Sequence, residues 1–248
     1  MQQWYGRYRN AVKVDIGAHE RRIGAMFDRV SRRYDGLNRI LSFGVDQRWR
    51  RRATDLARLG PHERALDVGA GTGDLALAIL RASAADTRVT ALDLSAAMLR
   101  RCGLRAAGAG LTRRIDLVVG TANALPFPDA CVDRVVAGFA VRNFADLAAG
   151  LREFRRVLRP GGRAVVLELS TPPNRLFGAI YRSYFEQLTP RVATFIGGDP
   201  EAYRYLPASV ARHPSAEAVA DLMRVAGFSA VRFERLTFGA ATIHVGEA

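Results

Sequence analysis

The 248-residue sequence has only two cysteines and no long uncharged run. Cys102 and Cys131 offer neither a disulfide framework nor the repeated ligand spacing of a zinc site. The longest stretch without Asp, Glu, Lys or Arg runs from Leu117 to Pro128, well short of the ~20 apolar residues that a helical membrane span requires. These absences argue against a disulfide-stapled secreted domain, a zinc module and a membrane-spanning protein. We therefore expect a cytoplasmic protein without a bound metal.

Lysine is also nearly absent, although the chain is strongly basic. Of the 37 basic residues only Lys13 is a lysine, and the formal net charge is +13. A charge of this size raises nucleic acid as a partner, because neutralising phosphates drives non-specific binding. Residues 1–60, however, hold 14 basic and 6 acidic residues, a net charge of +8. Because the excess is concentrated there, any electrostatic partner is expected to meet the N-terminal quarter.

From residue 64 onward, short apolar runs alternate with segments of helical periodicity. We predict strands at 64–68, 88–93, 115–119, 132–140, 164–168, 231–236 and 241–245, and helices at 74–82, 95–107, 146–158 and 216–226. Strands that alternate with helices imply right-handed crossovers and a parallel sheet with helices on both faces. The predicted fold class is therefore α/β, with a doubly wound, mostly parallel, seven-stranded Rossmann-like sheet.

The remaining segments flank this pattern. We expect a mobile basic arm at 1–20 and a single domain at 21–248, which divides into a helical lid (21–60), a cofactor-binding core (61–170), a helical insertion on the substrate side (171–210) and a C-terminal helix and hairpin (211–248).

A glycine-rich loop follows the first predicted strand. Gly69, Gly71 and Gly73 alternate with other residues, and Asp93 ends the next strand 20 residues later. Glycines let backbone N–H groups approach a ligand closely, and an acid at the end of the second strand can accept hydrogen bonds from ribose hydroxyls. The constellation predicts a nucleoside site. It also fits a dinucleotide fingerprint that ends at Ala76, or a tight turn with an exposed carboxylate.

Later segments separate these alternatives. The loop, together with Leu125-Pro126-Phe127 and Leu158-Arg159-Pro160-Gly161-Gly162, resembles a class I S-adenosylmethionine-dependent methyltransferase. The resemblance implies that the glycine loop holds the methionine end of the cofactor and that Asp93 holds the ribose. Many of these enzymes have an Asp for the adenine amino group where this chain has Thr121. The residues that the resemblance assigns to the cofactor are Asp67, Gly69, Gly71, Thr72, Gly73, Asp93, Met98, Thr121, Ala122 and Gly138.

Three further segments are similar to the menaquinone/ubiquinone biosynthesis C-methyltransferases: Tyr34-Asp35-Gly36-Leu37-Asn38, Val141-Arg142-Asn143 and Tyr203 to Ser209. This resemblance implies C-methylation of a polyprenylated quinol, with a naphthoquinol (demethylmenaquinol) favoured over a benzoquinol. It places Arg142 and Asn143 beside the transferred methyl group, where Arg142 would stabilise a developing phenolate and Asn143 would orient the quinol oxygen. Tyr34, Asp35 and His213 are candidate proton acceptors.

Other functions remain alternatives at this point. An RNA methyltransferase would suit the charge, but amino-group methylation of bases typically uses an Asn/Asp-Pro-Pro-aromatic signature, and the fourth strand here ends Gly138-Phe139-Ala140-Val141. A non-catalytic binding module is the second alternative. With a membrane-resident substrate, the arginines at 21–33 and 48–52 predict peripheral contact with anionic lipid, although a solvated basic face is equally consistent. We expect no nucleic-acid partner, and a homodimer is open.

Overall fold

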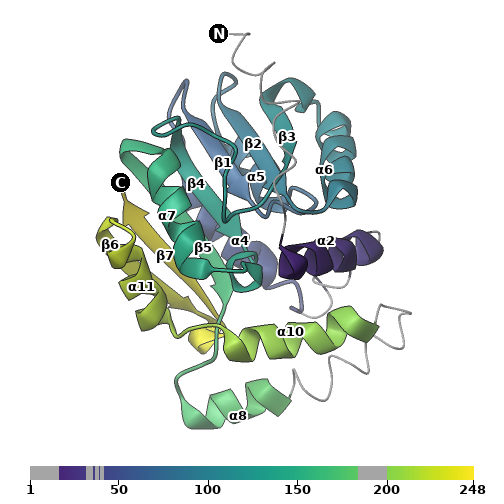
Figure 1. The fold of residues 1–248 in the computed structure, drawn as a ribbon, viewed down its shortest axis with the longest axis vertical. Helices are drawn as coiled ribbons and strands as arrows, with labels where there is room; N and C mark the ends of the chain where they lie inside the picture. The colour runs from purple at the N-terminus through teal and green to yellow at the C-terminus, as the bar shows by residue number, and fades with distance from the viewer. Residues whose placement is uncertain (1–16, 32–35, 37–38, 40–41, 184–199) are drawn as a thin grey trace.

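The computed structural model describes residues 17–31, 36, 39, 42–183 and 200–248. Its centre is one sheet with the strand order β3-β2-β1-β4-β5-β7-β6 (Figure 1). The strands are β1 (Arg64–Val68), β2 (Arg88–Asp93), β3 (Ile115–Val119), β4 (Val132–Gly138), β5 (Leu158–Leu169), β6 (Ser229–Leu236) and β7 (Ala241–Glu247). The first five strands pair in parallel, and β7 runs antiparallel between β5 and β6. The predicted seven-stranded, mostly parallel sheet is confirmed.

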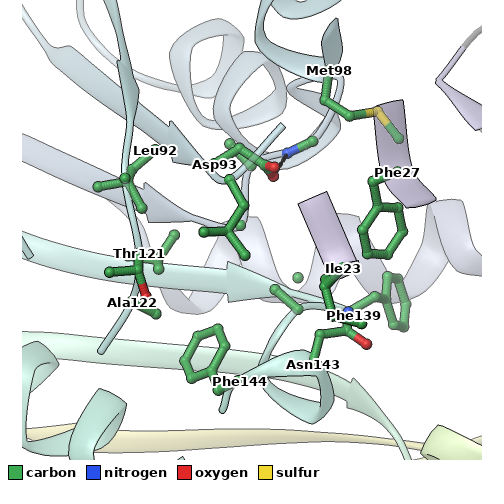
Figure 2. A pocket seen from close by; sticks show the side chains of 18 of the residues that line it. Ile23, Phe27, Leu92, Asp93, Met98, Thr121, Ala122, Phe139, Asn143 and Phe144 are labelled. Atoms are coloured by element: carbon green, nitrogen blue, oxygen red, sulfur yellow. Dashed lines mark hydrogen bonds between the residues drawn. The ribbon is translucent and has the colours of Figure 1, made fainter. Parts of the chain in front are cut away.

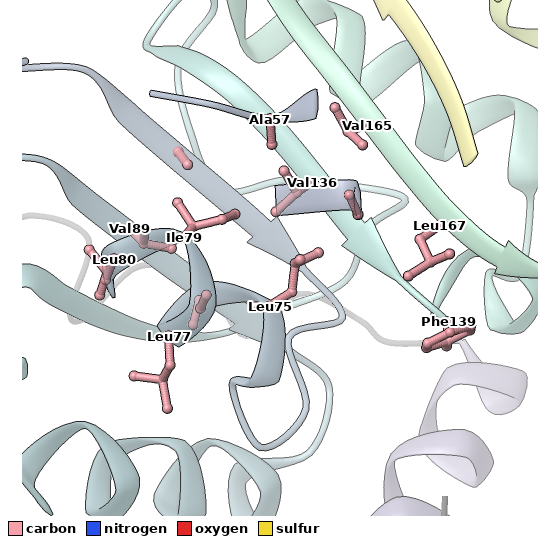
Figure 3. Close-up of a cluster of buried hydrophobic side chains, with 14 of the residues drawn as sticks. Ala57, Leu75, Leu77, Ile79, Leu80, Val89, Val136, Phe139, Val165 and Leu167 are labelled. Atoms are coloured by element: carbon pink, nitrogen blue, oxygen red, sulfur yellow. The ribbon is translucent and has the colours of Figure 1, made fainter. Parts of the chain in front are cut away.

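Alternation along the strands sorts their side chains into two cores. Ala65, Val136 and Val165 point to one face of the sheet and belong to a buried cluster with Leu75 and Leu80 (Figure 3). Their chain neighbours Leu66, Val135 and Val166 point to the other face and belong to a second cluster with Leu151 and Phe154. Both faces are apolar because a parallel sheet is covered by helices on both sides.

The helices divide between these faces. The first core packs against α4 (Asp46–Leu56), α5 (Asp74–Ala82) and α6 (Ala96–Gly108). The second packs against α7 (Leu147–Val157) and α11 (Ala216–Val225), which lie together in Figure 1. Side chains at the N-caps of three helices accept bonds from the first turn, namely Ser95, Asp146 and Ser215.

Three more helices lie along the carboxyl edge of the sheet (Figure 1). Helix α2 (Ala18–Val30) packs on α6 and on α10 (Pro200–Arg212), and α8 (Arg175–Ser183) lies beyond α10. The predicted lid and insertion therefore contribute helices to the same edge. Of the described residues, no helix is long and apolar enough to cross a bilayer.

Several predicted boundaries differ from the structure. The largest difference is in β5, which was expected at 164–168 but spans Leu158–Leu169, so that α7 ends at Val157 rather than at residue 158. Two others affect the lid and the end of the fourth strand. The expected arm was to end at residue 20, but α2 begins at Ala18 and Glu20 is buried within it. The fourth strand was expected to reach residue 140, but it ends at Gly138. Phe139 then takes a φ of 60°, which no extended strand contains. The chain turns there into the short helix η2 (Val141–Asn143).

Candidate functional site

A cavity opens at the carboxyl ends of β1, β2 and β4, where the strand order reverses between β1 and β4. This is the position at which open α/β sheets bind ligands. The space between the lining side chains is about 780 Å³ when the solvent at the mouth is included. Figure 2 shows Ile23 and Phe27 of α2 among the side chains that surround the cavity, together with Met98 and Phe139.

The glycine loop forms one wall of the cavity. Gly69, Gly71 and Gly73 all have positive φ, at 70°, 56° and 84°. A Cβ at Gly69 would lie 2.4 Å from the Ala140 Cβ, and one at Gly73 would lie 2.4 Å from the Cys102 Sγ. A Cβ at Gly71 would meet nothing within 4 Å. Two glycines are therefore required by packing, whereas the third leaves the backbone open on the cavity side.

Asp67 lies beneath this loop and does not line the cavity. Its Oδ2 accepts a hydrogen bond from the Ala76 N–H at 3.0 Å, which ties the end of β1 to the start of α5. Its Oδ1 is buried without a hydrogen-bond partner. Burial raises the pKa of Asp67 to about 7, against the opposing effects of the Ala76 N–H and the Arg50 charge. A positive group at this place would restore its ionised form.

Asp93 does line the cavity, at the end of β2. One carboxylate oxygen accepts from the Gly71 N–H and the other from the Ser95 N–H, both at 2.8 Å. Burial raises the pKa of Asp93, and these two backbone bonds lower it. Each oxygen keeps a further lone pair for a ligand hydroxyl. Asp93 thus also fixes the loop around Gly71.

The other predicted cofactor residues separate into two groups. Gly73, like Asp67, is absent from the cavity wall because it packs on Cys102. Tyr34, with Asp35, lies outside the described residues. The predicted residues that do line the cavity are Gly69, Gly71, Thr72, Asp93, Met98, Thr121, Ala122, Gly138 and Asn143.

Arg142 is turned away from the cavity wall. Its Nη1 donates to the Glu168 Oε1 at 2.7 Å and to the Phe139 carbonyl at 2.5 Å. The Glu168 carboxylate, on β5, also accepts from the backbone N–H of Arg142 at 3.1 Å. Both side chains are buried, so this is an internal ion pair. No motif in the sequence marks Glu168 as a site residue.

Asn143, by contrast, faces the cavity near Phe144 and Phe139 (Figure 2). Its Oδ1 accepts a hydrogen bond from the Tyr205 hydroxyl of α10 at 3.1 Å, and its carbonyl lies 3.1 Å from the His19 Nε2. Because the Oδ1 already accepts from Tyr205, the side-chain amide is oriented by a helix of the insertion.

Three charged residues on the cavity wall, Glu20, Arg50 and Asp74, were not predicted as site residues. Glu20 is buried and accepts a hydrogen bond from the Thr121 hydroxyl. Arg50 is buried beside the glycine loop, 3.6 Å from Asp74, with its guanidinium 4.9 Å from the Phe139 ring centre. Arg50 follows Asp46 by four residues and precedes Ala53 by three, and this helical spacing on α4 is a local signal that could have marked it as inward-facing.

Arg50 also changes the expected basic surface. The run from Arg48 to Arg52 was predicted to face lipid as a cluster, but Arg50 points inward and Arg52 pairs with Glu234 at 2.8 Å. Arg48 and Arg51 stay exposed, as do Arg21, Arg22 and Arg29 on α2. The run is divided because a helix turns successive residues to different sides.

Comparison with known proteins agrees with this architecture. A Thermus thermophilus demethylmenaquinone methyltransferase is 49% identical, with the match covering 90% of this chain and 99% of that protein. The ubiquinone/menaquinone biosynthesis C-methyltransferase UbiE of Geobacter sulfurreducens is 44% identical over 91% of this chain and 88% of its own. A solved S-adenosylmethionine-dependent methyltransferase of Thermotoga maritima shares the fold, with a TM-score of 0.63, 20% identity, and 90% of this chain and 98% of that chain covered. The profile of the ubiE/COQ5 methyltransferases matches residues 15–248. The chain therefore belongs to the ubiE/COQ5 methyltransferase family.

Proposed function

We propose that this protein transfers a methyl group from S-adenosylmethionine to a ring carbon of a polyprenylated quinol, converting demethylmenaquinol to menaquinol. The observation that carries the proposal is the 49% identity to the Thermus thermophilus demethylmenaquinone methyltransferase over 99% of that protein. The family match at 15–248 includes every residue that lines the cavity.

The cavity suits the cofactor in three respects. The backbone at Gly71 is open to a ligand, and the buried cation of Arg50 lines the same cavity, where it would bind the carboxylate of the methionine moiety. Asp67 lies behind the cavity wall, and an ammonium group in the cavity would favour its ionised form and be balanced by that charge. Asp93 offers lone pairs to ribose hydroxyls.

When bound, S-adenosylmethionine supplies a methyl group on a positively charged sulfur, so the protein mainly has to position the ring carbon and exclude water. The residues that we assign to holding it are Gly69, Gly71, Thr72, Asp93, Met98, Thr121, Ala122 and Gly138, together with Arg50. Asp67 and Gly73, which do not line the cavity, are assigned to shaping the loop from behind.

On the substrate side, Asn143 is the group that we assign to orienting the quinol oxygen. Its Oδ1 accepts from Tyr205, which leaves the amide N–H groups directed away from that bond and available to a phenolate. We assign Arg142 to positioning Asn143 through the Glu168 ion pair, while its positive charge favours a phenolate electrostatically.

His213 is our candidate for the proton acceptor. It lies at the end of α10, where its backbone N–H donates to the Ser209 carbonyl, and its charge interacts with Glu168 and Arg142. Burial lowers the pKa of His213, with Glu168 raising it and Arg142 lowering it further. A neutral imidazole at neutral pH is able to accept a proton. The other two candidates, Tyr34 and Asp35, lie outside the described residues.

The experiment is a methyl-transfer assay with purified protein and isotopically labelled S-adenosylmethionine. Demethylmenaquinol with a short prenyl tail, kept reduced, is expected to gain one labelled methyl group. A benzoquinol with the same tail is the matched competitor, because one relative is named for both quinones. Methylation of the benzoquinol alone would identify a benzoquinol, rather than demethylmenaquinol, as the substrate. Failure of both quinols, with intact binding of S-adenosylmethionine, would refute the quinol proposal.

We also propose that the exposed arginines of α2 contact anionic lipid, since the substrate carries a membrane-soluble tail. Arg21, Arg22 and Arg29 are exposed on one helix at the cavity edge, and each basic group near anionic lipid contributes about 1 kcal/mol. The triple change of these residues to Gln is expected to weaken co-sedimentation with phosphatidylglycerol vesicles, and added salt should do the same. Phosphatidylcholine vesicles are the control. A homodimer stays a prediction, measurable by light scattering.

A further inference from the structure

One buried carboxylate of the cavity has no role in the function proposed above. Glu20 belongs to α2, is 7% exposed, and lines the cavity. Its Oε1 accepts a hydrogen bond from the hydroxyl of Thr121, a residue 101 positions away that follows β3. A buried carboxylate is costly unless its oxygens have donors.

Helix α2 is held in place by contacts other than Glu20. The Asp28 Oδ1 accepts from the Ser95 hydroxyl at 2.5 Å and from the Ala97 N–H at 3.1 Å, at the start of α6. Gly24 lies against Leu94, where an added Cβ would be 3.5 Å from the Leu94 carbonyl oxygen. The position of Glu20 over the cavity is thus set by the packing of a whole helix, and its carboxylate is available for a ligand.

The surroundings of Glu20 indicate which ligand group it meets. Asp93 and the glycine loop supply polar groups to the cavity, and the wall also carries the apolar side chains of Leu94, Met98 and Ala122. Thr121, whose hydroxyl is bonded to the Glu20 carboxylate, lines the cavity directly before Ala122. A flat base packed on such apolar side chains would be held by its faces and selected by the hydrogen bonds at its edge.

We propose that Glu20 accepts a hydrogen bond from the exocyclic amino group of the adenine base, so that the lid helix α2 selects the base of the cofactor. This inference rests on the proposed binding of S-adenosylmethionine in the cavity. Thr121 brings a hydroxyl, which donates to one carboxylate oxygen and thereby directs the side chain. Glu20 of α2 supplies the acceptor for the base because Thr121, which follows β3, is itself uncharged.

The test compares two ligands that differ only in the base. S-adenosylhomocysteine presents an amino group to Glu20, whereas S-inosylhomocysteine presents a carbonyl oxygen that a carboxylate repels. Calorimetry is expected to give wild-type protein a preference for the adenosyl ligand of about 100-fold, because a mismatched edge leaves buried polar groups unpaired. The Glu20→Gln variant can donate to the inosine oxygen and is expected to reduce the preference to less than about threefold.

The controls separate base selection from loss of structure. Glu217→Gln makes the same chemical change on an exposed carboxylate of α11 and should leave the preference unchanged. General loosening of the lid would weaken both ligands equally and leave their ratio as in wild type, which would overturn the inference. Equal binding of the two ligands by wild-type protein would overturn it too, whether or not the variant folds. Absence of any S-adenosylhomocysteine binding by wild type would instead refute the proposed function.

Discussion

The guanidinium of Arg142 and the carboxylate of Glu168 form an ion pair that is almost wholly removed from solvent. The Nη1–Oε1 distance is 2.7 Å, and the two side chains are 6% and 1% exposed. Glu168 also accepts the backbone N–H of Arg142, so one carboxylate holds both the side chain and the main chain of the residue before Asn143. The group that faces the cavity is therefore positioned by a charge pair outside it.

Removing one member of this pair should cost stability as well as activity. We expect Arg142→Ala to lower the free energy of unfolding by about 3–5 kcal/mol, because Glu168 is left as an uncompensated buried charge. Turnover should fall, while the affinity for S-adenosylhomocysteine changes little. Urea denaturation and calorimetry measure the two effects. Arg152→Ala, an exposed change on α7, is the matched control, and a variant as stable as wild type would contradict the prediction.

Substitution by alanine should affect stability differently at Gly73 and Gly71, two positions of the glycine loop. At Gly73 the new Cβ would lie 2.4 Å from the Cys102 Sγ, so Gly73→Ala is expected to reduce the melting temperature strongly. At Gly71 the Cβ has space, so Gly71→Ala should cost only about 1–2 kcal/mol of left-handed backbone strain but obstruct the cofactor. Adding Cys102→Ala should restore part of the stability of Gly73→Ala. No rescue would mean that the contact with Cys102 is not the cause.

The raised pKa of Asp67 should make the free energy of unfolding depend on pH. Its pKa is about 7 in the folded protein against about 4 in the unfolded chain. The folded state then binds more protons between these values, so the contribution of Asp67 to stability is present below about pH 4 and lost as the pH rises through about 7. Asp67→Asn should therefore be more stable than wild type at pH 8, yet bind S-adenosylmethionine more weakly.

Urea denaturation at pH 5 and pH 8, without cofactor, measures this effect. The difference between variant and wild type should be larger at pH 8. Asp221→Asn, on the exposed side of α11, should show no such change with pH. The same stability gain at both pH values would indicate that packing rather than ionisation is responsible.

We expect Arg50 to make the cavity selective for ligands that carry the methionine carboxylate. Changing it to Met should weaken binding of S-adenosylmethionine by about 10–100-fold, since a charge-assisted hydrogen bond contributes about 1.5–3 kcal/mol. Decarboxylated S-adenosylmethionine should bind Arg50→Met and wild type with similar affinity. Arg48→Met on the exposed side of α4 is the control. Equal losses for both ligands would assign Arg50 to holding Asp74 instead.

If His213 accepts the proton, its titration should set the acid limb of the plot of turnover against pH. Because burial lowers the pKa of His213 below its ordinary value, the ring is neutral at pH 7 and turnover should fall only at more acidic pH. His213→Gln should lower kcat throughout and remove this acid limb, with little effect on the affinity for S-adenosylhomocysteine. A variant that keeps the limb would show that another group accepts the proton.

Local patterns predicted most of the sheet and its helices. The bounds of β1, β2, β3 and α5 agree with the predicted ranges, because alternation with period two and helical periodicity depend on neighbouring residues. The start of β5 at Leu158, ahead of the strand predicted at 164–168, was one exception, and Phe139 was another. Its positive φ ends β4 early and, for a bulky side chain, has no local sequence signal.

Motifs identified the glycine loop and Asp93, because the loop is one continuous segment and Asp93 ends the next strand along the chain. They could not identify Arg50, which stands in a run of arginines that composition alone makes a surface feature. They also could not show that Arg142 pairs with Glu168, because Glu168 lies on β5, the neighbour of β4 in the sheet.

By itself, the sequence determined the α/β order of this chain, its glycine loop and its resemblance to quinone methyltransferases, because these depend on residues close together along the chain. Tertiary structure alone decided what else lines the cavity. Glu20 meets Thr121, and Tyr205 meets Asn143, only because α2 and α10 pack across the carboxyl edge of the sheet. Contacts between residues so far apart depend on how whole helices pack, and no period or motif in the sequence records that packing.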